Sequence, residues 1–242
     1  MTVTLEWLAA ALVFALANFV LGLVGFGNGL VAMALLPFLM SPVTAIVVLT
    51  IYTIVFAVVI LIPLRRDVAL GPVFDLLVGS VVGVPAGVWV LSTVPISALN
   101  RLIGAALVAI VLLEWAGLYP GRLTGRGWGF GAGLLAGAVG AAIGTPGPPV
   151  IVYSTTQGWS QRTIKANLQA FFAVNQVVTL VGYWWAGLLT GTVWKLAGSF
   201  ALPAAGGVAA GVLLFNRVDH VQFRRVVFGL LLTAGAILIV RG

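Results

Sequence analysis

Long apolar stretches with few charged residues, separated by short polar segments, dominate the chain. A helix needs about 20 apolar residues to cross roughly 30 Å of hydrocarbon. Seven stretches approach or reach that length, at residues 5–24, 44–62, 70–91, 99–115, 163–185, 193–215 and 223–240. The pattern therefore predicts an all-α polytopic membrane protein.

Two apolar stretches end in a break rich in glycine and proline, and a short apolar run follows each break. Residues 5–24 and 128–143 lead into the breaks, and residues 30–40 and 150–156 form the short runs. At about 1.5 Å per residue neither short run crosses a bilayer. Each half of the chain then continues with three full spans, so we predict two repeats, at residues 1–119 and 120–242, within one membrane domain.

An offset of 119 positions aligns the two halves. It takes Gly25 onto Gly144 and Gly79 onto Gly198. By the last span the offset grows, because Gly104 matches Gly229, 125 positions later. The common order of elements supports duplication more than these identities do.

Composition excludes a water-soluble protein. Hydrophobic residues make up 62% of the chain and charged residues only 7%, whereas a soluble domain has roughly 45–50% and 25%. A soluble enzyme and a nucleic-acid-binding protein are therefore excluded. With no cysteine and one histidine, the chain also lacks the side chains for a thiolate or multi-histidine metal site, so we expect no metal and no cofactor.

The basic residues favour one of two topologies. If each broken hairpin enters and leaves on one side, the halves are inverted, and the basic residues divide nine to three. If the broken element crosses once, the halves are parallel and the division is six to six. Positive charge collects in cytoplasmic loops, so we predict inverted halves with both termini extracytoplasmic. The nine cytoplasmic residues are then Arg65, Arg66, Arg122, Arg126, Arg162, Lys165, Arg217, Arg224 and Arg225, and the other three are Arg101, Lys195 and Arg241.

The two breaks are candidate binding elements. Irregular backbone at membrane depth persists only where protein buries it or where it lines a polar cavity. Breaks at matching places in inverted halves predict a site near the midplane, and the N–H groups that begin each short helix favour an anion. The alternative is a loop that only closes a hairpin. The expected binding residues are Gly25, Gly27, Asn28, Gly29, Gly144, Thr145, Gly147 and Pro148.

A polar stripe follows one face of residues 163–185. Lys165, Gln169, Gln176 and Thr179 share this face, and such a stripe should face the bundle interior. The partner span at residues 44–62 offers Thr50, Tyr52 and Thr53, and Gln169 lies 119 positions after Thr50. We add Tyr52, Gln169 and Asn175 to the expected site, although hydrogen bonding between helices would also explain Asn175.

Charged groups within the spans are few. Lys165 is expected at a cytoplasmic mouth, with a snorkelling end residue as the alternative. Asp75 is the one candidate for coupling to protons, and its alternative role is an ion pair with Arg65 or Arg66. Glycines at positions i, i+4 and i+8 predict close helix packing, and they form two sets: Gly79, Gly83 and Gly87, and Gly129, Gly133 and Gly137.

The breaks Gly25-Phe26-Gly27-Asn28-Gly29, with Pro37 after it, and Gly144-Thr145-Pro146-Gly147-Pro148-Pro149 resemble those of the TauE/SafE sulfite exporter family. The resemblance covers nearly the whole chain, and the second break is its more specific part. It implies a permease of the cell membrane that moves sulfite, an organosulfonate such as sulfoacetate, or a related sulfur oxyanion. Asn28 and Pro146 stand where the family often has glycine.

Three alternatives stay open beside a secondary transporter of such an anion. One is a passive anion channel with the same site. Another is an intramembrane enzyme, for which Ser154 and Lys165 would be the candidate pair. The third is a structural subunit, against which the matched polar stripes argue. A homodimer, and the direction of transport, are left open.

Overall fold

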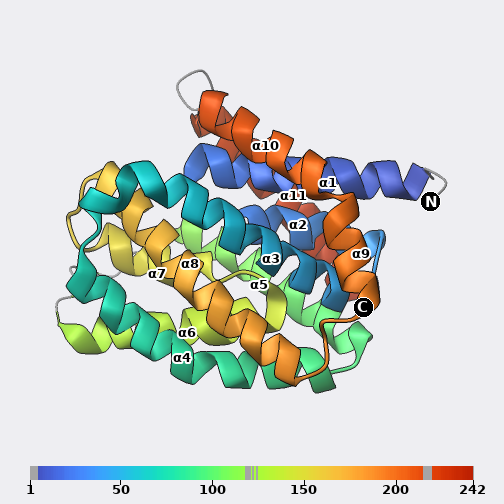
Figure 1. Cartoon of the computed structure of the whole chain (residues 1–242), viewed down its shortest axis with the longest axis horizontal. Helices are drawn as coiled ribbons and strands as arrows, with labels where there is room; N and C mark the ends of the chain where they lie inside the picture. Colours follow the sequence, from blue (N-terminus) through green and yellow to red (C-terminus); the bar gives the residue numbers. More distant parts are fainter. Residues whose placement is uncertain (1–4, 118–120, 122, 124, 215–219, 242) are drawn as a thin grey trace. The chain divides into compact units, whose positions relative to one another are not determined.

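The computed structural model describes residues 5–117, 121, 123, 125–214 and 220–241. Within these residues the secondary structure is entirely helical (Figure 1). The α-helices are α1 (Leu5–Val24), α2 (Asn28–Leu35), α3 (Pro42–Leu61), α4 (Leu70–Thr93), α5 (Ile96–Ala116), α6 (Arg126–Ile143), α7 (Gly147–Thr155), α8 (Gln161–Trp185), α9 (Gly191–Ser199), α10 (Ala201–Leu214) and α11 (His220–Arg241), and the 3-10 helices are η1 (Leu36–Phe38) and η2 (Ile62–Asp67).

The helices confirm an all-α polytopic membrane protein and some of the predicted spans. Among the described residues, α8 and α11, which cover the predicted spans 163–185 and 223–240, do not belong to the helices that are long and apolar enough to cross a membrane. Four helices are long and apolar enough to cross a membrane, α1, α3 continued by η2, α4 and α5, and the bent pair α9 and α10 makes up to five. The sequence predicted one continuous span over residues 193–215, but α9 and α10 meet at an angle of 49°. Pro203 explains the bend, because it has no N–H to donate to the carbonyl of Ser199.

The described residues form two compact units. Unit 1 comprises residues 1–49, 94–117 and 191–242, and unit 2 comprises residues 50–93 and 118–190. Unit 1 thus holds α1, α2, α5, α9, α10 and α11, whereas unit 2 holds α4, α6, α7 and α8, and α3 passes from unit 1 to unit 2 after Leu49. Each unit therefore draws helices from both predicted sequence halves.

Glycines bring α4 and α6 into backbone contact in unit 2, where the two helices run side by side (Figure 1). A Cβ atom at Gly83 would meet the carbonyl oxygen of Leu134, and one at Gly133 would meet the carbonyl oxygen of Leu76. Only residues without side chains allow helices to approach this closely. The predicted packing role of both glycine sets is confirmed at Gly79, Gly83, Gly87, Gly133 and Gly137.

The same kind of crossing occurs in unit 1, between α1 and α10. Gly207 and Gly211 of α10 lie against the carbonyls of Ala15 and Phe19 of α1. The α6 residues that contact Gly83 and Gly87 are Leu134 and Ala138, and they lie 119 positions after Ala15 and Phe19. The α10 glycines Gly207 and Gly211 lie 124 positions after Gly83 and Gly87.

Two of the glycines that the sequence offsets match do not share a packing role. Gly198, matched with Gly79 at the offset of 119, has no atom within 4 Å of its Cβ position. Gly229, matched with Gly104, is equally open, and Gly104 instead lies against Gly235 where α5 packs on α11. The repeat that these offsets suggested stays a prediction.

Contacts within unit 2 set the directions of its helices. The amide of Ala69, before α4, donates to Asn167 near the start of α8 over 2.8 Å, and Val88 near the end of α4 packs on Gly182 near the end of α8. The helices α4 and α8 therefore run in the same direction. The pair α6 and α7 forms a hairpin, since Tyr153, late in α7, packs against Gly129, early in α6.

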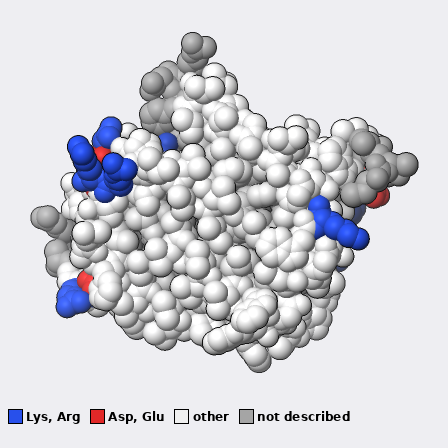
Figure 2. Space-filling model, viewed as in Figure 1, with Lys and Arg blue, Asp and Glu red and all other residues white. Residues whose placement is uncertain are grey.

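Charged side chains of unit 2 gather at one end, where α4, α6 and α8 begin (Figure 2). Arg162 at the start of α8 pairs with Asp67 of η2, with 2.8 Å between Nε and Oδ2. The Nε atom of Arg126 at the start of α6 lies 3.0 Å from Oδ1 of Asp75 on α4. The predicted cytoplasmic residues Arg122 and Arg217 lie outside the described residues.

Candidate functional site

The break in unit 2 is a tight reversal between α6 and α7. Gly144 ends α6 with a φ of 74°, which only glycine adopts without strain, and its amide donates to the carbonyl of Gly140 over 2.9 Å. Pro146 then packs directly on Gly140. Between them lies Thr145, which is 3% exposed and whose hydroxyl has no hydrogen-bond partner among the described residues.

The break in unit 1 uses two left-handed glycines between α1 and α2. Gly25 has a φ of 90° and Gly27 a φ of 88°. The Gly25 amide donates to the carbonyl of Leu21 over 2.8 Å, so the helix end is capped within the chain. Asn28 begins α2 and is 7% exposed, and Gly29 is buried beside it.

The two short helices differ in the donors that they offer an anion. The N-cap and first turn of α2 run Gly27-Asn28-Gly29-Leu30, and every residue carries an N–H group. The corresponding residues of α7 run Pro146-Gly147-Pro148-Pro149, where only Gly147 carries one. Proline costs little at a helix start, but it leaves α7 with one amide donor and the Thr145 hydroxyl. The expected binding role of Pro148 is therefore limited to lining the site.

Each break lies near one end of its partner helix. In unit 2 Gly87, six residues before the end of α4, packs on Ala138 and Ala141 at the end of α6. In unit 1 Gly22, near the end of α1, packs on Val208 and Val212 of α10, which ends at Leu214. These contacts place each break along its partner helix but not in a membrane, so a site near the midplane stays a prediction.

The polar stripe of α8 faces the protein interior, as predicted from its spacing. Gln169 and Thr179 have no exposed surface, and Gln176 is 3% exposed. Thr179 donates its hydroxyl to the carbonyl of Asn175 over 2.9 Å, and Asn175 donates to Gln176 over 3.2 Å. These hydrogen bonds lie within α8, so they do not bear out the alternative of hydrogen bonding between helices. The side-chain oxygen Oδ1 of Asn175 has no partner among the described residues.

Tyr183 is a buried polar residue beside the second break that the sequence pattern did not single out. It is fully buried in α8, and its hydroxyl donates to the carbonyl of Ala141 over 2.7 Å and shares a hydrogen bond with Thr50. The Ala141 carbonyl lies in the last turn of α6, where helix carbonyls lack helical partners. The signal was present, because Tyr183 continues the spacing of Gln176 and Thr179.

Replacing Tyr183 by phenylalanine is expected to destabilise the protein by about 1–3 kcal/mol, because the buried Ala141 carbonyl loses its donor. Thermal or denaturant unfolding of the purified variant in detergent measures this loss. An unchanged unfolding midpoint would show that another group satisfies this carbonyl.

Asp75, the candidate for coupling to protons, and Lys165, the candidate at the cytoplasmic mouth, have different surroundings in unit 2. Asp75 pairs with Arg126, not with Arg65 or Arg66, because the start of α6 packs beside α4. Its side chain is 14% exposed, and its ion pair gives it a structural role. Lys165 is half-buried in the first two turns of α8, at the same end of unit 2 as Arg162.

The expected site residues fall into two sets. Unit 1 holds those of the first break, Gly25, Gly27, Asn28 and Gly29, and unit 2 holds the rest, Tyr52, Gly144, Thr145, Gly147, Pro148, Gln169 and Asn175. All seven residues of the second set are buried or half-buried, which suits a site inside the protein. That the two sets act on one substrate stays a prediction.

Comparison with known families gives one match. The model of the sulfite exporter TauE/SafE family matches residues 10–238. No curated protein and no solved structure matches the chain. The match extends from α1 to α11 and includes both breaks.

Proposed function

Because the chain belongs to the sulfite exporter TauE/SafE family, we propose that it moves sulfite or a small organosulfonate, such as sulfoacetate, across the cell membrane by alternating access. The family consists of membrane transporters for sulfite-type anions, not of enzymes. The single observation that carries the site is the buried Thr145 hydroxyl, which lacks a partner among the described residues and lies at the break before α7.

Uncharged donors would recognise the anion at both breaks. Tetrahedral and pyramidal sulfur oxyanions carry several acceptor oxygens, which suits short arrays of N–H and O–H groups. The start of α2 supplies backbone amides from Asn28, Gly29 and Leu30, and the start of α7 supplies the Gly147 amide and the Thr145 hydroxyl. Weak, uncharged recognition also favours release, which transport requires as much as binding.

We propose inverted halves with both termini extracytoplasmic. Two features of unit 2 support this topology. The helices α4 and α8 run in the same direction, as inverted halves require and parallel halves forbid. The ion pairs of Arg162 and Arg126 lie at the same end of the unit, as the nine-to-three division of basic residues requires.

Transport in proteoliposomes tests the function directly. Vesicles loaded with sulfite, sulfoacetate, sulfate or chloride are expected to show protein-dependent flux of a sulfur anion but not of chloride. Accumulation of that anion above its equilibrium level, driven by an imposed ion gradient, would exclude the passive channel, because a channel only lets a solute move down its own electrochemical gradient. Flux that only dissipates gradients would support the passive channel instead.

A further inference from the structure

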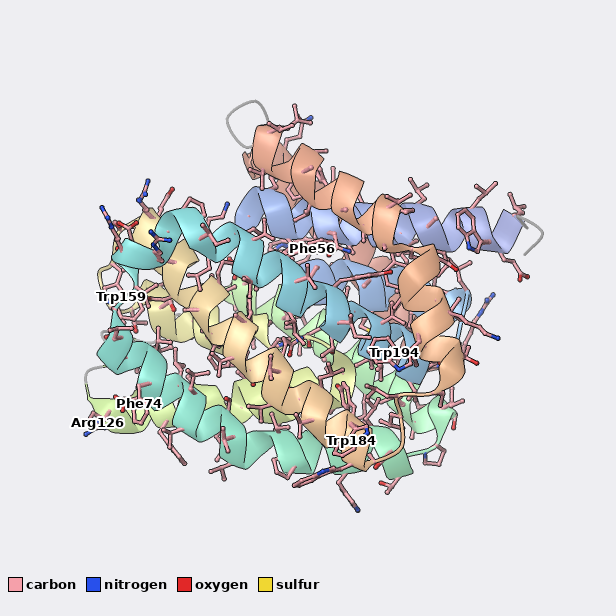
Figure 3. The ribbon with its side chains drawn as sticks, viewed as in Figure 1. Phe56, Phe74, Arg126, Trp159, Trp184 and Trp194 are labelled. Carbon is pink, nitrogen blue, oxygen red and sulfur yellow. The ribbon has the colours of Figure 1, made fainter. Side chains whose placement is uncertain are left out.

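A cavity of about 790 Å³ lies at the charged end of unit 2, where α4 and α6 begin and α7 ends. Its apolar wall includes Leu70, Phe74 and Leu77 of α4, and its polar rim includes Asp75, Arg126 and Tyr153. Figure 3 shows Phe74 and Arg126 close together at this end, on the same side as Trp159, whereas Trp184 lies at the far end of α8. Tryptophan at both ends is typical of the two membrane interfaces.

The size of the cavity does not suit the small anion proposed as substrate. A water molecule takes roughly 30 Å³ in the liquid, so the cavity of about 790 Å³ holds on the order of 25 groups of that size. Sulfite has four heavy atoms. A molecule that fills the cavity must be several times larger and must have an apolar body to cover the α4 wall.

The rim offers one site for an anionic head group. Arg126 uses its Nε atom for Asp75, and within the described residues its two terminal nitrogens make no other hydrogen bond. Asp75 thus orients the guanidinium, and the two terminal nitrogens can bind a phosphate or sulfonate in a bidentate manner. The side chain of Arg126 is 82% exposed, so a ligand reaches it without any movement of the helices.

The wall beside Arg126 is unusually open for apolar side chains. Leu70 is 78% exposed and Phe74 is 59% exposed, although both belong to the first turns of α4 and line the cavity. In a membrane protein such side chains contact hydrocarbon. A cationic group that can bind an anion and a surface that contacts hydrocarbon therefore lie side by side, at the end of unit 2 that the basic residues assign to the cytoplasmic leaflet.

We propose that this cavity binds one anionic phospholipid, with its phosphate on Arg126 and an acyl chain along Leu70 and Phe74. The lipid would hold the α6–α7 hairpin against α4 at this end, because the cavity is lined by all three helices. Lipid binding at this cavity does not depend on which anion the protein transports, so it can be tested without the transport assay.

The test measures lipid binding to the purified protein in a neutral detergent, by thermal unfolding and by native mass spectrometry. Phosphatidylglycerol is expected to raise the unfolding temperature and to remain bound, because a ligand of the native state stabilises it. Phosphatidylcholine is expected to do neither at the same concentration. In R126Q the apparent affinity for phosphatidylglycerol is expected to fall on the order of tenfold.

Two matched controls separate this site from general charge effects. R162Q removes an arginine that is 63% exposed and also pairs through Nε with an aspartate. One terminal nitrogen of Arg162 also donates to the carbonyl of Pro63, and Arg162 does not line the cavity, so binding should be unchanged. Glycerol phosphate, the head group without acyl chains, should not reproduce the stabilisation. Equal losses in R126Q and R162Q, full stabilisation by glycerol phosphate, or equal stabilisation by phosphatidylcholine would each overturn the proposal.

Discussion

Replacing Gly133 by leucine is expected to abolish folding of the protein. A Cβ atom at this position would meet the carbonyl oxygen of Leu76 and would lie 2.7 Å from its carbonyl carbon. Backbone atoms of α4 cannot rotate away as a flexible side chain would, so α4 and α6 must separate. Overpacking a core costs about 1–3 kcal/mol and sometimes more, and here it disrupts the most extensive helix contact of unit 2.

Graded variants distinguish this contact from a general intolerance of α6. Gly133→Ala is expected to destabilise the protein already, because the Cβ atom alone makes the clash. Gly131→Leu is the matched control, since a Cβ atom there meets nothing within 4 Å. The measurements are the yield of monodisperse protein in detergent and its unfolding midpoint. Recovery of monodisperse Gly133→Leu with the yield and unfolding midpoint of Gly131→Leu would contradict the close packing of α4 and α6.

The helices and the glycine contacts could be predicted because they depend on local pattern. Apolar length sets the extent of α1, which begins and ends at the predicted residues, and spacing alone revealed the packing faces of α4 and α6. Pro203 was equally visible, but a proline inside an apolar run does not by itself show whether the helix bends. Pro85 lies within α4, which continues through it to Thr93.

The partners of the helices could not be predicted in the same way. Nothing in an apolar span specifies which other span it contacts, so the pairing of α1 with α10 and of α4 with α6 required the structure. For the same reason Asp75 was assigned to Arg65 or Arg66, its neighbours in sequence, whereas its partner is Arg126, 51 positions away.

The number of backbone N–H donors at each break can be counted from the sequence. The absence of amide hydrogens at Pro146, Pro148 and Pro149 is a property of the sequence, and it leaves α7 a weaker anion site than α2. The burial of Thr145 without a partner could not be inferred, because it depends on how Pro146 packs against Gly140. Together these facts make the Thr145 hydroxyl the main side-chain donor that the second break can offer an anion.

Replacing Thr145 by valine is therefore expected to reduce transport by about 10- to 100-fold while the protein stays folded. The substitution keeps the shape of the side chain and removes the hydroxyl, which has no partner among the described residues to lose. A hydrogen bond to a charged group contributes about 1.5–3 kcal/mol, which corresponds to that range if the bond forms with the anion. Thr145→Ser retains the hydroxyl and is expected to keep most of the activity.

Thr179→Val is the matched control, because Thr179 is also a buried threonine but its hydroxyl already donates to the carbonyl of Asn175. It should lose some stability and little transport, whereas Thr145→Val should lose transport and little stability. Initial rates of sulfite and sulfoacetate flux in proteoliposomes, with unfolding midpoints of the same preparations, separate the two effects. Full transport by Thr145→Val would remove the second break from the substrate site, and the amides at the start of α2 would then be the remaining candidates.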